Sequence, residues 1–351
     1  MKLNRRPHVT LSDIAKQLNV SKVTVSKALR GHPDISRETT KLVKKVAEEL
    51  GYTPNFAARN LSSRKSSTIG VVVPKIAHFF FSSIIEAIYD EAFNNNYDIA
   101  LTVSQENAER EKKHIETLMA MRVDGLIVSI TQETKDKAIF EKVLSRDVPL
   151  VFMDRVLQMN GTSQVTVDDK GGAIKAIELA ITNGYTKIAH IGGYKEINIG
   201  KSRYEGYMEA MRRHGLPIEP DWVIHGGFGE DDGYQGFMKF YRSGHMPEFI
   251  FAVTYPVALG VYAAAAEVGV RIPDDLDIVC FGSASINKFL KPALTYIDQP
   301  TETIGRSAVD LVLEHIAETE DYRPKFVEVP TELVMRDTCV RRKPLVSSAA
   351  K

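Results

Sequence analysis

From Ile69 onward, short apolar runs alternate with longer amphipathic segments. The runs IGVVV, GLIVSI and FIFAV contain almost no charged or strongly polar residue, which is typical of strands buried on both faces of a parallel sheet. Segments with helical periodicity separate such runs, for example at 81–94 and 107–121. The series of strand and helix restarts near Val165. This pattern predicts an α/β core made of two doubly wound parallel sheets, with a ligand cleft between two lobes.

The first fifty residues have a different pattern, with three short helical segments and no apolar run. In VTLSDIAKQLNVSKVTVSKAL, Thr10 and Asp13 are spaced as a capping box, and Asn19 lies where the chain must turn sharply. Ser21 can cap a second helix and Ser36 a third. The third helix has an inner stripe of apolar residues and ends near Gly51. The sequence therefore predicts a small helical headpiece before the α/β core.

The second of these helices has one apolar face and one polar, cationic face. Val25 and Leu29 face inward, which leaves the outer face to Lys22, Val23, Ser26 and Lys27. Two closely spaced helices with such a face are typical of a DNA-binding helix-turn-helix. An ordinary helical hairpin with solvated lysines is the alternative interpretation. We favour DNA binding, with Lys22, Val23 and Lys27 on the exposed surface.

The distribution of charge supports this preference. The whole chain has a formal net charge of zero, but residues 1–66 carry 14 Lys and Arg against 5 Asp and Glu. Such asymmetry is typical of a nucleic-acid-binding end joined to an acidic body. The basic segment PNFAARNLSSRKSST at 54–68 is either a flexible linker or a hinge that becomes helical on DNA.

Several classes of protein are disfavoured by what the sequence lacks. Only Cys280 and Cys339 are present, so a disulfide framework is excluded. The first residues contain no apolar signal segment, and no run approaches the roughly 20 apolar residues of a membrane span. We therefore expect a cytoplasmic protein, associated with the bacterial nucleoid, and we expect no metal and no cofactor. A two-lobed enzyme and a sugar-binding transport protein remain as alternatives, although no catalytic motif was found.

The whole chain from about Val9 to Arg336 resembles the lactose-repressor (LacI/GalR) family of bacterial transcription regulators. The most specific segments are SDIAKQLNVSKVTVSKAL and SRETTKLVKKVAEELGYTPNFAARNL, followed in order by STIGVVVP, HFFFSSIIEAI, RVDGLIV, VDDKGGA, SRYEGY, VALG and PALTYIDQP. The resemblance implies a repressor that is not an enzyme, with a periplasmic-binding-protein-like core controlled by a small metabolite. It also implies a homodimer that binds a pseudo-palindromic operator in double-stranded DNA.

The resemblance also assigns expected limits to each part of the chain. The headpiece is expected at 1–53, the hinge at 54–67, and the effector-binding and dimerisation core at 68–345. Within the core, lobe one is expected at about 68–164 and 297–329, and lobe two at about 165–296 and 330–345.

Particular residues fall on the family's DNA-binding positions. Lys22, Val23 and Lys27 match base-reading positions, and Lys27 can donate to guanine O6 or N7. Thr10 belongs to the same surface, while the hydroxyl residues Ser21, Thr24 and Ser36 match phosphate contacts. In the hinge, Leu61 matches a leucine that wedges into a base step, with backbone contacts expected from its neighbours Asn55 and Arg59.

Six residues match effector-binding positions in the core: Phe80, Phe81, Asp154, Arg203, Phe228 and Tyr255. Core packing is the alternative role for the two adjacent phenylalanines, and a surface salt bridge is the alternative for Arg203. Two acids common in the family are absent, because Tyr255 replaces one and the segment Phe281–Gly282–Ser283 replaces the other. We therefore expect Arg203 to meet Asp154 on the ligand and to carry much of the polar recognition. A sugar-derived or anionic effector follows, with a carboxylate or phosphate preferred.

Overall fold

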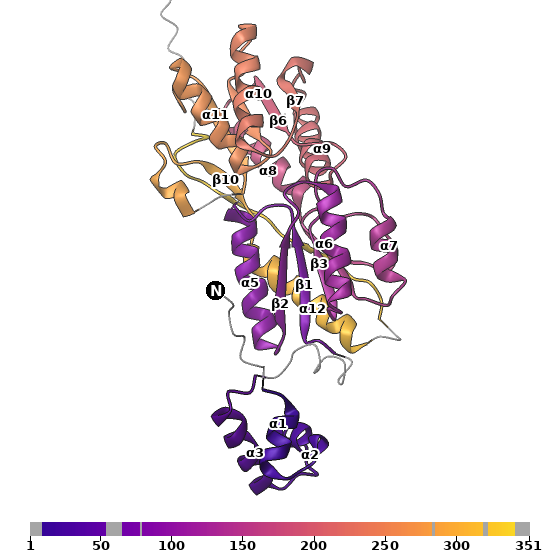
Figure 1. Ribbon diagram of the computed structural model, residues 1–351. Helices are drawn as coiled ribbons and strands as arrows, with labels where there is room; N and C mark the ends of the chain where they lie inside the picture. Colours follow the sequence, from indigo (N-terminus) through magenta and orange to yellow (C-terminus); the bar gives the residue numbers. More distant parts are fainter. Residues whose placement is uncertain (1–8, 54–64, 78, 283–284, 319–321, 341–351) are drawn as a thin grey trace, which may run out of the picture. The chain divides into compact units, whose positions relative to one another are not determined.

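The chain divides into two units, Met1–Ser66 and Ser67–Lys351. Figure 1 shows the computed structural model. It describes residues 9–53, 65–77, 79–282, 285–318 and 322–340. The border between the units lies one residue before the end of the predicted hinge, 54–67. No helix in the described part of the chain is long and apolar enough to cross a bilayer.

The described part of the first unit contains three helices: α1 (Leu11–Leu18), α2 (Lys22–Leu29) and α3 (Arg37–Glu49). The predicted caps form. The Asp13 carboxylate accepts a hydrogen bond from the Thr10 backbone N–H at 2.8 Å, and the hydroxyls of Ser21 and Ser36 accept backbone N–H groups at the starts of α2 and α3. Asn19 has a φ of 52°, the left-handed conformation that the tight turn needs.

The three helices meet around a small apolar core. Ile14, Val25 and Val43 contribute one completely buried side chain from each helix. The inner stripe predicted for the third helix is confirmed, since Val46 and Ala47 are buried and Leu50 packs against the same cluster. The headpiece is therefore held together by a handful of aliphatic side chains, as the spacing of apolar residues predicts.

The second unit contains two six-stranded sheets. The first sheet has the order β11-β5-β4-β3-β1-β2, and its strands are β1 (Thr68–Val73), β2 (Asp98–Val103), β3 (Gly125–Val128), β4 (Leu150–Met153), β5 (Ser163–Val167) and β11 (Phe326–Val329). The second has the order β12-β10-β9-β8-β6-β7, with β6 (Ile188–Gly192), β7 (Val223–His225), β8 (Phe249–Ala252), β9 (Asp277–Phe281), β10 (Thr295–Asp298) and β12 (Glu332–Val334). All pairings are parallel except that of β10 with β12.

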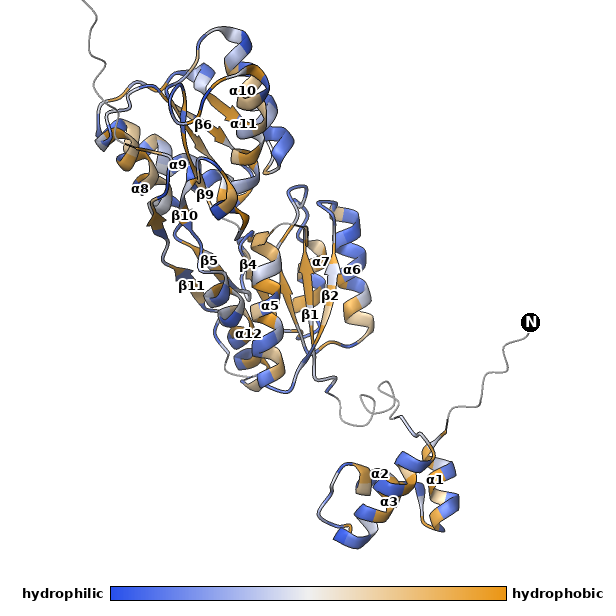
Figure 2. Ribbon diagram, turned by 90° about the vertical axis from the view of Figure 1, so that its left-hand side faces the viewer, coloured by the Kyte–Doolittle hydropathy of each residue, from blue (hydrophilic) through white to orange (hydrophobic). Residues whose placement is uncertain are grey.

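Helices cover both faces of each sheet (Figure 1). The first lobe carries α5 (Phe79–Asn94), α6 (Ala108–Ala120), α7 (Ala138–Leu144) and α12 (Thr301–Ala317). The second carries α8 (Asp169–Thr182), α9 (Asn198–Arg213), α10 (Glu230–Ser243) and α11 (Tyr255–Val268), with short 3₁₀ turns η1 (Pro220–Trp222) and η2 (Ser285–Phe289). In Figure 2 the strands β1 and β4 are hydrophobic while α6 exposes a hydrophilic face. Burial on both faces explains the apolar runs of the sequence.

The chain passes between the lobes three times, and this corrects one expected boundary. Strand β5 pairs with β4, so it belongs to the first sheet and not to the second lobe, where the restart of the pattern at Val165 had put it. The crossings follow β5, β10 and β11. The two last strands are divided between the sheets, β11 beside β5 and β12 beside β10.

Candidate DNA-binding surface and effector pocket

Helix α2 presents the side chains that the sequence assigned to base reading. Val23 has 64% of its surface exposed, and Lys22 is also exposed, so neither side chain is needed for the headpiece core. Lys27, one turn further on, is partly exposed and contacts Asp34. An exposed valine beside two lysines offers an apolar contact and two cationic donors on one helix face.

The hydroxyl residues of the headpiece have structural partners. The hydroxyls of Ser21 and Thr24 lie 2.8 Å apart, and that of Ser36 lies 2.9 Å from the Thr39 hydroxyl. The Thr10 hydroxyl donates to Asp13 at 2.7 Å. These bonds give the residues a capping role at the starts of the three helices. The expected hinge contacts Asn55, Arg59 and Leu61 lie outside the described residues.

In the core, a cavity of about 120 Å³ lies between the two lobes. All six residues that the sequence assigned to the effector line it: Phe80, Phe81, Asp154, Arg203, Phe228 and Tyr255. They come from α5, from the loops after β4 and β7, and from α9 and α11. The cavity is slightly smaller than the roughly 150 Å³ that accommodates a benzene ring in a protein interior. It therefore suits a small, ring-sized ligand.

The aromatic residues form the apolar part of the cavity wall. The rings of Phe80 and Phe81 meet edge to face with their centroids 5.2 Å apart. Phe81 is only 3% exposed and belongs to a buried apolar cluster, so it packs in the core as well as lining the cavity. Phe228 contributes a buried ring from the second lobe.

Asp154 and Glu230 are the acidic residues that line the cavity, and no described residue donates a hydrogen bond to the Asp154 carboxylate. Its backbone has a φ of 63°, and the backbone is fixed by the bonds from the Asp154 N–H to the Val165 carbonyl and from the Asn198 side chain to the Asp154 carbonyl. Burial raises the pKa of the carboxyl to about 6, although the nearby Arg155 and Arg203 oppose the shift. The backbone of Asp154 is thus fixed, and its carboxylate is available to a ligand donor.

Arg203 differs from the expectation, because its charge is already paired inside the second lobe. Its Nε donates to Asp169 at 2.8 Å and its Nη1 to the Val253 carbonyl at 2.6 Å. Its Nη2 donates to Gln299 at 3.2 Å, and the guanidinium lies 3.7 Å from the centroid of the Phe281 ring. Arg203 is 1% exposed, so its ion pair is buried rather than at the surface. Asp169, and not Asp154, is its carboxylate partner.

The two positions that lack the usual acids are occupied in different ways. Tyr255 is 5% exposed, and its hydroxyl has no hydrogen-bond partner among the described residues. Burial raises its pKa to about 12, so the hydroxyl stays protonated. Gly282 has a φ of 79°, and a Cβ there would lie 2.8 Å from the Gln299 Nε2. The glycine therefore allows the Gln299 side chain to approach and reach Arg203, whereas Ser283 lies outside the described residues.

Both units match known families. A family model for bacterial regulatory proteins of the lacI family matches residues 10–55. A model for periplasmic binding proteins and the sugar binding domain of the LacI family matches residues 66–337. The chain belongs to the LacI family.

Individual relatives of this LacI-family chain are similar over nearly its whole length. The HTH-type transcriptional repressor PurR of Pasteurella multocida is 33% identical over 333 residues, 95% of this chain and 99% of that protein. The Lac repressor dimer bound to operator and the anti-inducer ONPF has a TM-score of 0.82 at 25% identity, covering 95% of this chain and 99% of that chain. The transcriptional regulator CelR in complex with cellobiose has a TM-score of 0.72 at 25% identity, covering 95% and 100%.

The family decides between the hypotheses drawn from the sequence. This LacI-family protein is a DNA-binding transcriptional regulator with an effector-binding core, and the family is not one of enzymes. His190, in the middle of β6, is structural. Its Nδ1 lies 2.9 Å from the Phe251 carbonyl, its ring stacks on Tyr207, and burial lowers its pKa to about 3.

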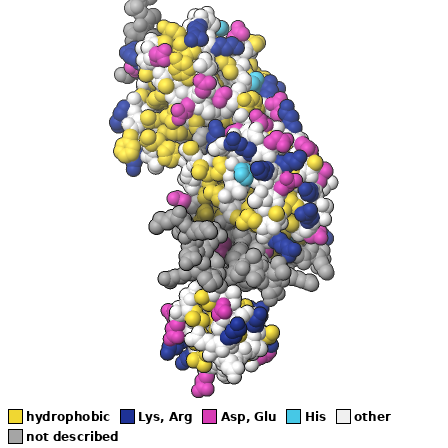
Figure 3. Space-filling model, in the orientation of Figure 1, with side chains coloured by type: hydrophobic (Ala, Val, Ile, Leu, Met, Phe, Trp, Pro, Cys, Tyr) yellow, Lys and Arg dark blue, Asp and Glu magenta, His cyan; other side chains and the backbone are white. Residues whose placement is uncertain are grey.

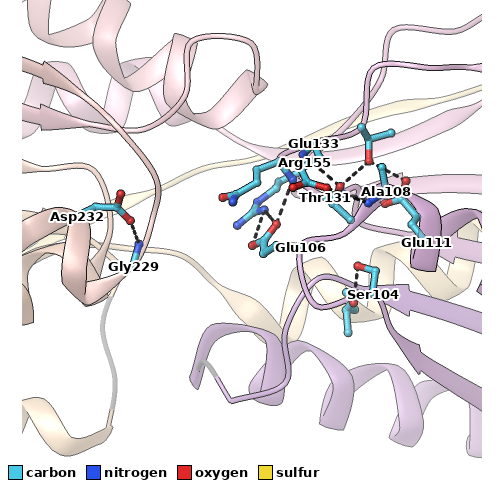
Figure 4. Close-up of polar contacts among 12 residues, drawn as sticks. Ser104, Glu106, Ala108, Glu111, Thr131, Glu133, Arg155, Gly229 and Asp232 are labelled. Atoms are coloured by element: carbon cyan, nitrogen blue, oxygen red, sulfur yellow. Dashed lines mark hydrogen bonds and ion pairs between the residues drawn. The ribbon is translucent and has the colours of Figure 1, made fainter.

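Arg155 also lines the cavity of this regulator, although it was not among the residues predicted from the sequence. Its Nη1 lies 2.9 Å from both carboxylate oxygens of Glu106, as Figure 4 shows. The guanidinium lies 4.7 Å from the centroid of the Phe228 ring in the other lobe, and its buried Nε has no partner among the described residues. The sequence did contain an indication of this position, because Arg155 follows Asp154 at the carboxyl end of a predicted strand. Ligands of parallel sheets bind at those ends.

Glu111 lies beside the same corner of the first lobe (Figure 4). Its carboxylate accepts the Thr131 backbone N–H at 2.8 Å and the Thr134 hydroxyl at 2.7 Å, and Gln132 donates its N–H to Glu106 at 3.0 Å. Burial raises the pKa of Glu111 to about 7 despite these bonds. This buried acid fixes the loop after β3, which in turn holds the partner of Arg155.

Proposed function

We propose that this regulator represses transcription by binding a pseudo-palindromic operator as a homodimer, under the control of a small effector held between its lobes. The single observation that carries the proposal is the cavity between the lobes. Six residues from five separate segments of the chain meet there, among them Asp154, whose backbone is fixed and whose carboxylate has no partner among the described residues. Since operator DNA lies in the cytoplasm of a bacterium, we propose that the protein acts there.

On the DNA side, we propose that Lys22, Val23 and Lys27 of α2 read base edges in the major groove. Their exposure on one helix face supports this assignment. The phosphate contacts are assigned to the cap residues Thr10, Ser21, Thr24 and Ser36, because helix N-termini attract phosphate. For the hinge we keep the sequence-based proposal that Leu61 wedges into a base step beside Asn55 and Arg59.

The exposed hydrophobic residues of the core support a homodimer. Tyr89 and Phe93 on α5 are 45% and 80% exposed, and Ile286 and Phe289 on η2 are 43% and 71% exposed. In the view of Figure 1, α5 and the orange segment near β10 both lie at the left-hand edge of the core, and Figure 3 shows hydrophobic side chains gathered at that edge of the upper lobe. Large exposed apolar patches of this kind are typical of protein interfaces.

The charges of the cavity favour a neutral effector over the anionic one expected from the sequence. Arg203 is neutralised by Asp169 and Arg155 by Glu106, so neither cation needs an anionic ligand. Asp154 would repel a carboxylate or a phosphate. A neutral ring that donates to Asp154, bonds to Tyr255 and stacks on the phenylalanines fits the wall better. Hexoses, pentoses and nucleobases have this chemistry.

The experiment combines a gel shift with effector screening. Duplexes flanking the gene, or duplexes selected from a random library by the full-length protein, are titrated with it in the presence of neutral sugars, nucleobases and sugar acids. We expect a specific complex whose affinity is changed by one neutral compound. Specific binding that responds only to sugar acids or phosphates would contradict the effector class, and the absence of any selected sequence would contradict the assignment of the DNA-reading residues.

A further inference from the structure

The loop after α2 holds the end of the proposed DNA-reading helix in a defined geometry. Gly31 has a φ of 67°, and its N–H donates to the Ala28 carbonyl at 3.0 Å. The His32 N–H donates to the Lys27 carbonyl at 3.0 Å. This pair of bonds is a Schellman motif, in which the chain reverses direction at the helix end. The loop that follows is therefore folded back beside Lys27 itself.

Within this loop, Asp34 binds the lysine side chain. The Lys27 Nζ lies 2.8 Å from the Asp34 Oδ2, and the His32 Nδ1 lies 3.4 Å from the same oxygen. The next residue, Ile35, donates its N–H to the His32 carbonyl at 3.1 Å and packs against the headpiece core. The position of Asp34 is thus set by its anchored neighbours and by the Schellman turn.

The contact is too exposed to contribute much to folding. The side chains of Lys27 and Asp34 are 34% and 57% exposed, and exposed ion pairs add little to stability. The hydrogen bond from Lys27, followed by the charge of His32, lowers the pKa of Asp34, so the pair is charged at neutral pH. An acid held next to a lysine on the proposed DNA-binding surface weakens the attraction to phosphate, so we expect its effect in DNA binding.

We infer that Asp34 is a specificity-determining residue, which positions Lys27 for guanine and restrains it from binding phosphate. This rests on the proposed function, in which Lys27 reads a base. A lysine ammonium has three donors. One bonds to Asp34, which directs the remaining two toward O6 and N7 of a guanine. On DNA without a guanine at that place, Lys27 stays paired with Asp34 and neutralises no phosphate.

The test compares Asp34→Asn with a matched control in the full-length protein. The control is Glu49→Gln, because Glu49 pairs with the exposed Lys45 on α3 at 3.8 Å. Each substitution removes one exposed carboxylate and releases one lysine. Affinity is measured from 50 to 200 mM salt on a random-sequence duplex and on a duplex selected by the wild-type protein. Thermal unfolding checks that both variants remain folded.

For Asp34→Asn we expect tighter binding to the random duplex, by about threefold or more at the lowest salt concentration. The slope of log Kobs against log salt should become steeper by about 0.9, the value for one additional phosphate contact. The ratio of specific to non-specific affinity should fall by at least threefold. In Glu49→Gln this ratio should remain that of the wild type. A wild-type slope and ratio in Asp34→Asn would overturn the inference.

A third variant separates this inference from the function on which it rests. In a Lys27→Ala background, Asp34→Asn should no longer change the salt slope or the specificity ratio. If the same changes persist there, Asp34 acts by repelling phosphate directly and does not position Lys27, which overturns the inference alone. If Lys27→Ala by itself leaves the specificity ratio unchanged, Lys27 reads no base, and both the assignment of Lys27 and the inference fail.

Discussion

Asp169 and Arg203 form an ion pair at 2.8 Å in which both side chains are at least 95% buried. Asp169 begins α8, directly after the chain has crossed from β5, while Gln299, the other side-chain partner of Arg203, follows β10 at a second crossing. Arg203 therefore binds residues at two of the three connections between the lobes. Its position in the cavity wall and its role in the fold are coupled, because the same guanidinium serves both.

The first prediction concerns the stability of this pair. Arg203→Ala should lower the free energy of unfolding of the core by about 3–5 kcal/mol, since it leaves the Asp169 carboxylate buried without its partner. Denaturant unfolding of the full-length protein measures this change. Lys201→Ala is the control, because Lys201 lies on the same helix with its side chain 65% exposed. If Arg203→Ala lowers the free energy of unfolding no more than Lys201→Ala does, the ion pair has no structural role.

The second prediction concerns the pH dependence of effector binding. The carboxylate form of Asp154 accepts hydrogen bonds from a neutral ligand, and its pKa in the unliganded protein is raised to about 6. Affinity should therefore be constant well above pH 6 and should fall about tenfold per pH unit well below it. Calorimetric titration with the compound found in the screen provides the measurement. The Asp154→Asn variant should bind the compound weakly and lose this pH dependence. A pH profile of affinity like that of the wild type would exclude Asp154 as a ligand-binding residue.

The third prediction concerns base reading. Lys27→Ala should weaken binding to the selected operator by about 1–3 kcal/mol, the contribution of one good base contact. Binding to random-sequence DNA should change little, because Asp34 already pairs with Lys27. Parallel titrations of both duplexes provide the measurement. Equal losses on the two duplexes would mean that Lys27 contacts a phosphate.

The fourth prediction concerns Glu111. Burial raises the pKa of its carboxyl from 4.5 to about 7, so the folded state binds this proton more tightly than the unfolded state. The free energy of unfolding is therefore reduced as pH rises from about 4.5 to 7, and the reduction is complete above pH 7. The glutamine side chain of Glu111→Gln cannot ionise. The Tm of this variant minus the Tm of the wild type should therefore increase from pH 5 to pH 8. A Tm difference that stays constant from pH 5 to pH 8 would contradict the raised pKa of Glu111.

Local chemistry explains how much of the headpiece could be predicted. Caps such as Thr10 with Asp13, and the turn at Asn19, depend on residues within a few positions of each other. The cavity residues Asp154 and Phe228 could also be predicted, because each follows a strand, and the carboxyl ends of parallel strands meet at one edge. In both cases the position of a residue in the sequence pattern predicts its place in the structure.

What the sequence by itself determined was the set of elements, the class of fold and the side chains at the ends of the strands. Only the tertiary structure decided that β5 joins the first sheet, that Asp169 neutralises Arg203, and that Gly282 admits Gln299 to the same site. The physical reason is that strand pairing and buried ion pairs form between segments distant in the chain. Arg203 meets Asp169 because α8 packs along α9, a contact that no local spacing of residues encodes.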